Sequence, residues 1–386
     1  MMGQWAAMSM LTITQSLLVY RLTGSAAILG ILALATAIPQ LLLFLLGGAL
    51  ADRFQKKLLI QIGQLAAGAM SLVVAITLTT GYMSQQHPGS WWVLMATSVI
   101  QGIVAALAIP ARQAIIPELL NIELVMNALA LNTMGTNIFR LVAPAIAGIL
   151  IDTIGFAAVF YIMAGLYLVA VVLTAFIPAT RKTTIRNRST LADAGGGLVY
   201  IWSRRTILLI LIYAIFYIVL FMPYQMMLPI FADTIIKVGA TGLGVLQSVS
   251  GVGALVASLA LASSTNSKRG FLILGGGMLA GIGLVTLAFS HSWYLSLGAM
   301  FIIGAGSAVH STALVAVLQV LTDAEYLGRV MSILMMNQGL SGLGTFFVGI
   351  LAEGIGVQRA IGGFALSLIL LSFSFLVFIP RIRKLS

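Results

Sequence analysis

Cysteine is absent from all 386 residues, and charged residues are scarce. The lack of cysteine excludes disulfide bonds and thiolate metal sites. Asp, Glu, Lys and Arg together make up only 8% of the chain, whereas a soluble domain carries about 25%. Hydrophobic residues reach 60% and the mean hydropathy is +1.10. These values exclude a soluble globular domain and predict an all-α membrane protein with many spans.

Acidic residues are fewer than basic residues. The chain has nine Asp and Glu against twenty Lys and Arg, a net charge of +11. Such a balance can indicate a nucleic-acid partner. Here, however, the cations form short clusters between apolar runs, which is typical of loops in a membrane protein. We therefore expect the lipid bilayer as the partner, and no nucleic acid.

Long apolar runs take up most of the chain. A bilayer core of roughly 30 Å needs about 20 apolar residues in each helix. The first run is short, so we expect the chain to lack the start of its first helix. The sequence predicts twelve transmembrane helices, at residues 3–20, 26–50, 58–80, 91–112, 124–151, 156–178, 206–231, 241–261, 271–289, 293–318, 328–352 and 360–379.

The cations are unevenly divided between the two sides of these helices. Most lie in the even-numbered turns, the central polar segment and the C-terminus, whereas Arg21, Lys237 and Arg359 lie on the other side. Cytoplasmic loops carry the excess of Lys and Arg. This bias predicts a multi-pass protein of the plasma (inner) membrane with both termini in the cytoplasm.

One long polar segment, residues 179–205, divides the helices six and six. It predicts a helical bundle at 1–178, a basic cytoplasmic linker at 179–205 and a second bundle at 206–386. Weak internal similarity supports a duplication: Gln113 precedes Val125-Met126-Asn127 much as Gln319 precedes Val330-Met331-Ser332. Chance similarity in apolar sequence is the alternative.

A short basic turn separates the second and third predicted helices. Its residues 47–57 read Gly-Gly-Ala-Leu-Ala-Asp-Arg-Phe-Gln-Lys-Lys. This stretch resembles the loop motif Gly-x-Leu-x-Asp-Arg-x-Gly-Arg-Arg of the major facilitator superfamily. Gln55 replaces a glycine of that motif, which argues against a left-handed turn there. The matching residues are Gly48, Leu50, Asp52, Arg53, Lys56 and Lys57.

The resemblance implies the major facilitator fold, with two pseudo-symmetric six-helix bundles, and a cytoplasmic gate at this turn. Asp52 would lie against the N-terminus of another helix, where its charge is favourable. Arg53 would pair with an acid, either Glu118 or Glu123, and Arg112 would join the same cluster. The alternative is a plain turn that only sets the topology.

Other stretches resemble the branch of this superfamily that includes the enterobactin exporter and multidrug-efflux proteins. They are residues 18–25, 110–114, 117–119, 228–232 and 328–332. The segment Ala143-Pro144-Ala145-Ile146-Ala147-Gly148 is similar to the Gly-Pro-x-x-Gly-Gly motif of the fifth helix in exporters. Pro144 and Gly148 keep their place, and alanine replaces two glycines. The resemblance implies export.

Arg140 lies near the middle of the fifth predicted helix. A cation there costs about 3 kcal/mol on insertion scales and is a functional hypothesis by default. We expect it to bind an anionic group or to act in gating. A structural cation held by helix carbonyls or amides is the alternative. Asn132 and Asn137 share part of its helix face and extend the polar stripe.

The superfamily resemblance also implies that the first, fourth, seventh and tenth helices line a central cavity. Amides and aromatics there suit a bulky amphipathic ligand, although each residue alone is more often part of the packing than a ligand contact. None of the nine acids is expected in mid-membrane, and His310 could carry a proton near neutral pH. Proton coupling therefore rests on the resemblance. The nominated residues are Gln15, Gln101, Tyr213, Tyr217, Gln225 and His310.

The sequence thus favours a secondary transporter that exports a bulky organic compound, drug-like or siderophore-like, by alternating access as a monomer. An importer or lipid transporter of the same fold is the alternative, and a non-transporting receptor or scaffold is a third. No phosphate-binding loop ends in Gly-Lys-Ser/Thr, which argues against direct use of ATP. No metal-ligand cluster or nucleophile–base motif predicts a cofactor or an enzyme.

Overall fold

The computed structural model describes residues 2–53, 55–87, 89–119, 122–178, 199–263, 268–323, 325–379 and 381. Within helices, the side chains of residues 2, 44–53, 113, 114, 117, 122 and 123 lie outside this description, as does most of the predicted linker. All regular elements in the described ranges are helices. This is the expected outcome for apolar runs in lipid, where a helix satisfies every backbone polar group internally.

Five helical elements precede the linker. They are α1 (Met2–Thr23), α2 (Ala26–Arg53), α3 (Lys56–Thr79), α4 (Trp92–Leu119) and α5 (Ile122–Ala175). The element α5 holds two predicted helices, because its backbone breaks at Gly155, where φ is 82°. Glycine tolerates this conformation because it has no Cβ. Between α2 and α3, Gln55 is extended, with φ −61° and ψ 120°, so the backbone makes no left-handed turn at this position.

Eight elements follow the linker. They are α7 (Arg205–Phe221), α8 (Pro223–Ile230), the π-helix η1 (Phe231–Ile235), α9 (Gly239–Ala262), α10 (Arg269–Phe289), α11 (Trp293–Leu321), α12 (Leu327–Ile355) and α13 (Val357–Phe378). The seventh predicted helix is divided into α7, α8 and η1. Its breaks lie near the prolines: α7 ends at Phe221, two residues before Pro223, and Pro229 lies two residues before the start of the π-helix. Each proline removes a helix hydrogen bond.

The number of spans matches the prediction of twelve. Ten helical segments in the described part of the chain are long and apolar enough to cross a bilayer. One of these, Leu124–Ala175, contains both limbs of α5 and counts twice. The first predicted helix corresponds to α1, which is 22 residues long but is not among these ten segments. The described part of the chain is therefore that of an all-α membrane protein, in agreement with the twelve predicted transmembrane helices.

Contacts divide the chain into two compact units. The first comprises residues 1–187 and 228–248, and the second comprises 188–227 and 249–386. Residues 228–248, which form η1 and the start of α9, therefore pack with the first part of the sequence. The division into 1–178, 179–205 and 206–386 describes the order along the chain and stays a prediction.

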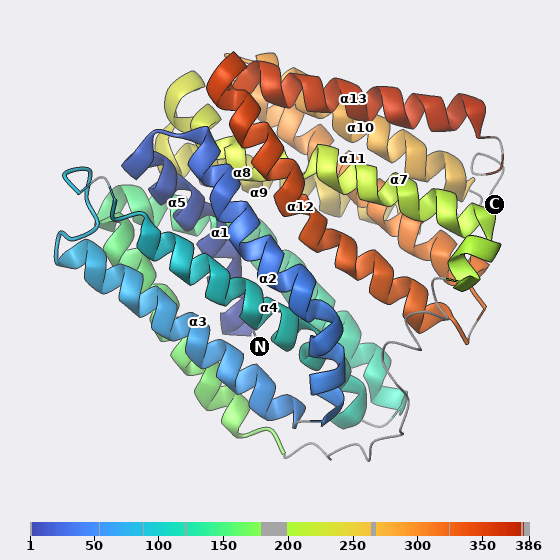
Figure 1. Cartoon of the computed structure of the whole chain (residues 1–386), viewed down its shortest axis with the longest axis horizontal. Helices are drawn as coiled ribbons and strands as arrows, with labels where there is room; N and C mark the ends of the chain where they lie inside the picture. The colour runs from blue at the N-terminus through green and yellow to red at the C-terminus, as the bar shows by residue number, and fades with distance from the viewer. Residues whose placement is uncertain are drawn as a thin grey trace. The chain divides into compact units, whose positions relative to one another are not determined.

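Close backbone approaches hold the first unit together. In Figure 1, α2 packs against α4, and both α1 and α3 pack against α5. A Cβ added at Gly102 of α4 would overlap the Thr36 carbonyl of α2. Such small-residue contacts drive helix association in lipid, where apolar burial alone gives no preference for helix over lipid.

The second unit uses the same kind of contact. Its α10 packs against α11 and α13, and α12 packs against α7 and α13 (Figure 1). A Cβ at Gly304 would overlap the backbone of Ser250, and one at Gly253 would overlap that of Phe301. The helices α9 and α11 thus approach each other closely at small residues on both sides, Ser250 and Gly253 of α9 and Gly304 of α11.

Candidate functional site

One face of α5 meets the start of α9. A Cβ at Gly148 would overlap the carbonyl of Ala240, and one at Gly244 would overlap that of Pro144. One turn further along α5, the carboxylate of Asp152 accepts hydrogen bonds from the Thr241 amide at 2.8 Å and its hydroxyl at 2.7 Å. The partial exporter motif therefore forms the contact surface between α5 and α9.

Arg140 and Asn137 continue this face toward the N-terminus of α5. They lie four and seven residues before Pro144, so helical spacing places all three on one side. Unlike Pro144 and Gly148, both Arg140 and Asn137 are exposed, and Asn132 is half-buried. Within the described part of the chain, Arg140 has no carboxylate partner.

The exposed apolar side chains of α5 lie on another face. Ile138, Val142 and Ile149 are between 39% and 48% exposed, and they point away from the line through Arg140 and Pro144 by helical geometry. This apolar face suits contact with lipid. The charge of Arg140 is thus on the protein-contacting side of α5, where an anionic group could bind it.

A second polar cluster lies at the turn between α2 and α3. The Lys56 ammonium lies 2.5 Å from the Glu118 carboxylate of α4. The Lys57 ammonium donates to the carbonyls of Ala175 and Ile177, at 2.7 and 2.6 Å. It thereby caps the C-terminal end of α5, where a cation is favoured.

Three other motif residues belong to the end of α2, but their side chains lie outside the description: Gly48, Asp52 and Arg53. The structure places Arg112 elsewhere. Its guanidinium lies 5.3 Å from the centre of the Trp5 ring and 3.4 Å from the sulfur of Met8. Arg112 therefore packs against α1 instead of joining the pair of Lys56 and Glu118.

A third cluster, at the opposite end of α1, is missed by the sequence reasoning. The Arg21 guanidinium makes a bidentate pair with Asp233 of η1, with distances of 2.7 and 3.0 Å. The hydrogen bond to Asp233 raises the pKa of Arg21 above its usual value. Arg21 also lies over the Phe156 ring, and its carbonyl accepts a hydrogen bond from Gln85. The sequence did contain a signal for this pair. Arg21 and Asp233 have opposite charges, and each lies at the end of a predicted helix on the same predicted side of the membrane.

The predicted cavity residues fall into both units. In the first, Gln15 is buried and donates to the Ser98 hydroxyl at 2.8 Å, whereas Gln101 is half-buried. In the second, Gln225 is half-buried, and Tyr213, Tyr217 and His310 form one buried aromatic cluster. The Tyr213 hydroxyl lies 2.7 Å from that of Ser372. Gln15 therefore joins α1 to α4. The cluster of Tyr213, Tyr217 and His310 brings together more polar side chains than the pair of Gln15 and Ser98.

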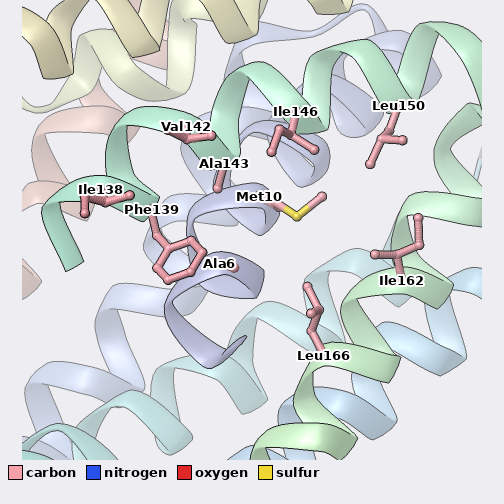
Figure 2. Close-up of a pocket in the computed structure, with 10 residues that line it drawn as sticks. All are labelled: Ala6, Met10, Ile138, Phe139, Val142, Ala143, Ile146, Leu150, Ile162 and Leu166. Carbon is pink, nitrogen blue, oxygen red and sulfur yellow. The ribbon is translucent and has the colours of Figure 1, made fainter. Parts of the chain in front are cut away.

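An apolar pocket of about 220 Å³ lies between α1 and the two limbs of α5 (Figure 2). Met10 and Ala6 contribute from α1, Phe139 and Ile146 from the first limb, and Leu166 from the second. All the lining side chains are apolar, so the pocket suits a hydrocarbon group. Among the described residues there is no group of three or more His, Asp or Glu that could hold a metal ion.

A twelve-helix bundle protein with intramembrane polar groups and broken helices belongs to the class of multi-pass membrane transporters. The particular family follows from comparison with known proteins. Residues 1–345 match the sequence pattern of the Major Facilitator Superfamily, and the chain therefore belongs to this superfamily. The protein is therefore a secondary transporter of a small molecule and is not an enzyme.

Two bacterial relatives match over most of the chain. The Staphyloferrin A transporter of Staphylococcus aureus (strain NCTC 8325 / PS 47) is 27% identical over 366 residues, covering 94% of this chain and 89% of the relative. The uncharacterized MFS-type transporter YfiS of Bacillus subtilis (strain 168) is 23% identical over 362 residues, covering 89% and 83%.

Solved structures show the same fold. A bacterial homologue of the human lysosomal transporter Spinster, inward-facing and unoccupied, has a TM-score of 0.78 at 13% identity, with 100% of this chain and 96% of that chain covered. A D-xylose–proton symporter has a TM-score of 0.75 at 16% identity, covering 100% and 97%. The fold is thus the major facilitator fold, with two pseudo-symmetric six-helix bundles.

Proposed function

We propose that this transporter exports a bulky amphipathic organic compound by alternating access, with protons as the coupling ion. It acts as a monomer in the plasma (inner) membrane, with both termini in the cytoplasm. The excess of Lys and Arg on one predicted side supports this orientation. The partial exporter motif at Pro144 and Gly148 supports the direction and the assignment to the efflux branch.

The observation that carries the proposal is the position of Arg140. Its face of α5 contacts α9 at Pro144 and Gly148 but is exposed at Arg140 and Asn137. A substrate with an anionic group would supply the partner that the described residues do not give Arg140. Guanidinium groups bind carboxylates and phosphates through two parallel hydrogen bonds. Arg140 is thus the proposed anion-binding residue, with Asn137 and Asn132 beside it.

A transported lipid is the second candidate. The apolar pocket beside α1 favours it, because the pocket accepts a hydrocarbon group and has no polar lining side chain. One relative is called a Staphyloferrin A transporter, so staphyloferrin A is the first compound to test.

The test is flux in proteoliposomes with an imposed pH gradient, using staphyloferrin A and then compounds selected by thermal shift. Arg140→Gln should lower flux about tenfold or more, since a hydrogen bond to a charged group contributes about 1.5–3 kcal/mol. Arg140→Lys should keep part of the flux. Arg359→Gln, which removes a cation on the predicted outer side, is the matched control.

Normal flux by folded Arg140→Gln would refute the anion site. The direction is read separately, by comparing gradients of opposite sign. Flux only toward the side that carries the central linker would favour an importer. Transfer of a fluorescent phospholipid without transport of any soluble compound would favour the lipid transporter.

A further inference from the structure

His310 lies close to the middle of a membrane-spanning helix. It is 11 residues before the end of α11 at Leu321, which corresponds to about 16 Å along the helix axis. A bilayer core of roughly 30 Å therefore places it near the midplane. Its side chain is only 2% exposed. A titratable group at this depth needs an explanation beyond space filling.

The hydrogen bond of His310 fixes its tautomer. The ring nitrogen Nδ1 lies 3.0 Å from the carbonyl oxygen of Ile273 in α10. A carbonyl oxygen can only accept, so Nδ1 carries a hydrogen and donates it. In the neutral ring, Nε2 then holds the lone pair. Nε2 is thus the position at which a proton can be added without breaking the bond to Ile273.

Tyr217 provides a surface for the cation that would form. Its ring stacks on the His310 ring with centroids 3.6 Å apart and an angle of 20° between the planes. A cation over the face of an aromatic ring is attracted by its quadrupole. The Tyr217 hydroxyl is also buried and has no hydrogen-bond partner among the described residues. A buried hydroxyl without a partner costs about 1–3 kcal/mol. A hydrogen bond from a water molecule or a substrate atom to the Tyr217 hydroxyl would remove this cost.

The groups around His310 are neutral in this conformation. Tyr213 lies 5.6 Å from its ring centre and bonds to Ser372 of α13, and α10 contributes the Ile273 carbonyl. In the described part of the chain, no carboxylate or cation contacts the ring. A charged imidazolium here would lose hydration without gaining a counter-ion. The neutral ring therefore fits this conformation, and protonation favours one in which the ring meets water or substrate.

The acidic residues with described partners are engaged near helix ends. Asp233 pairs with Arg21, Glu118 pairs with Lys56, Asp323 pairs with Arg204, and Asp152 accepts from Thr241. We propose that Nε2 of His310 is the site that binds the coupling proton, with the Tyr217 ring and hydroxyl as its partners. This inference rests on the proposed proton-coupled transport. In each cycle, water on one side protonates Nε2 and water on the other side accepts the proton.

Two transport modes in proteoliposomes separate this inference from the proposed function. Exchange of staphyloferrin A, or of the compound found by thermal shift, at equal pH needs no net proton movement. Accumulation driven by a pH gradient needs it. His310→Gln should reduce gradient-driven accumulation at least tenfold and keep exchange within about twofold. Tyr217→Phe keeps the ring but removes the hydroxyl, and it should reduce accumulation more than exchange.

His291→Gln is the matched control, because His291 lies in the connection between α10 and α11 and is exposed. It should leave both modes unchanged. Gradient-driven accumulation at the unaltered level by His310→Gln, or by His310→Asn if the first variant does not fold, would overturn the proton site. If the unaltered protein exchanges the compound but shows no gradient-driven accumulation, coupling to protons fails while transport stands.

Discussion

The pair of Lys56 and Glu118 is the shortest ion pair in the described part of the chain. Its side chains are 10% and 21% exposed, so both charges are largely removed from solvent. The pair of Arg204 and Asp323 has the same chemistry but is 3.2 Å long and 57% exposed on each side. The two pairs therefore form a natural comparison between a buried and an exposed interaction.

Glu118→Gln should lower the free energy of unfolding by about 2 kcal/mol, because it leaves the Lys56 ammonium buried without a counter-charge. Asp323→Asn should change it by less than about 1 kcal/mol, since exposed pairs contribute little. The midpoint of thermal unfolding of the purified protein in detergent measures both. Equal shifts would show that burial does not strengthen the first pair, and the reversed pair Lys56→Glu with Glu118→Lys should restore part of the loss.

At the residue scale, the sequence predicted that Arg53 pairs with Glu118 or Glu123, and this stays a prediction because the side chain of Arg53 lies outside the description. The structure shows Glu118 paired with Lys56. Chain spacing cannot decide between two cations three residues apart, and only the direction of α3 brings Lys56 to α4. The pair of Arg21 and Asp233 was missed for a related reason. Its members are 212 residues apart, so no local pattern connects them.

The contact between α5 and α9 depends on the absence of side chains. Gly148→Leu should force the two helices apart, because the new Cβ would overlap the Ala240 carbonyl. Overpacking of this kind costs about 1–3 kcal/mol. The expected result is a lower midpoint of thermal unfolding together with reduced flux.

Gly165→Leu is the matched control on the same element, because a Cβ at Gly165 meets nothing within 4 Å. It should leave the unfolding midpoint within about a degree, as expected of a lipid-facing substitution. If Gly148→Leu behaved like Gly165→Leu, the close approach of α5 and α9 would have no energetic role.

At the element scale, the length of the apolar runs predicted most of the helices. The break before Pro223 follows from the missing amide hydrogen. The π-helix Phe231–Ile235 was not predicted, because π-helical turns are rare and have no sequence pattern comparable to apolar periodicity. The packing partners of the glycine faces, such as Gly148 with Ala240, could be assigned only from the structure.

At the scale of the whole molecule, hydropathy and the positive-inside bias predict twelve spans and the family fold. They do not predict that residues 228–248 pack with the first 187 residues. In lipid, an apolar helix face contacts hydrocarbon as favourably as it contacts another helix. Which helices pack together therefore depends on the shapes of their surfaces and on a few polar pairs. Arg21 with Asp233 and Asp152 with Thr241 are two such pairs, and both join the first half of the sequence to residues 231–241.

Arg21 and Asp233 are therefore expected to hold this end of the transporter closed. Asp233→Asn removes the charge that binds the guanidinium, and a charged hydrogen bond contributes about 1.5–3 kcal/mol. The open population should then rise about tenfold. Because the chain has no cysteine, Ala240→Cys gives a single thiol at a position that is fully buried here. In the proposed orientation this end faces the outside of the cell, and labelling from there by a membrane-impermeant maleimide should become about tenfold faster in Asp233→Asn.

Two variants in the Ala240→Cys background complete the test of this closure. Asp323→Asn breaks the exposed pair with Arg204 and should leave the labelling rate unchanged. Exchanging the two residues, Arg21→Asp with Asp233→Arg, retains one charge of each sign at this end, so labelling should return toward the unaltered rate. Equal labelling in all three backgrounds would show that small-residue packing between α5 and α9 alone keeps this end shut, since Gly148 and Ala240 would then suffice without the ion pair.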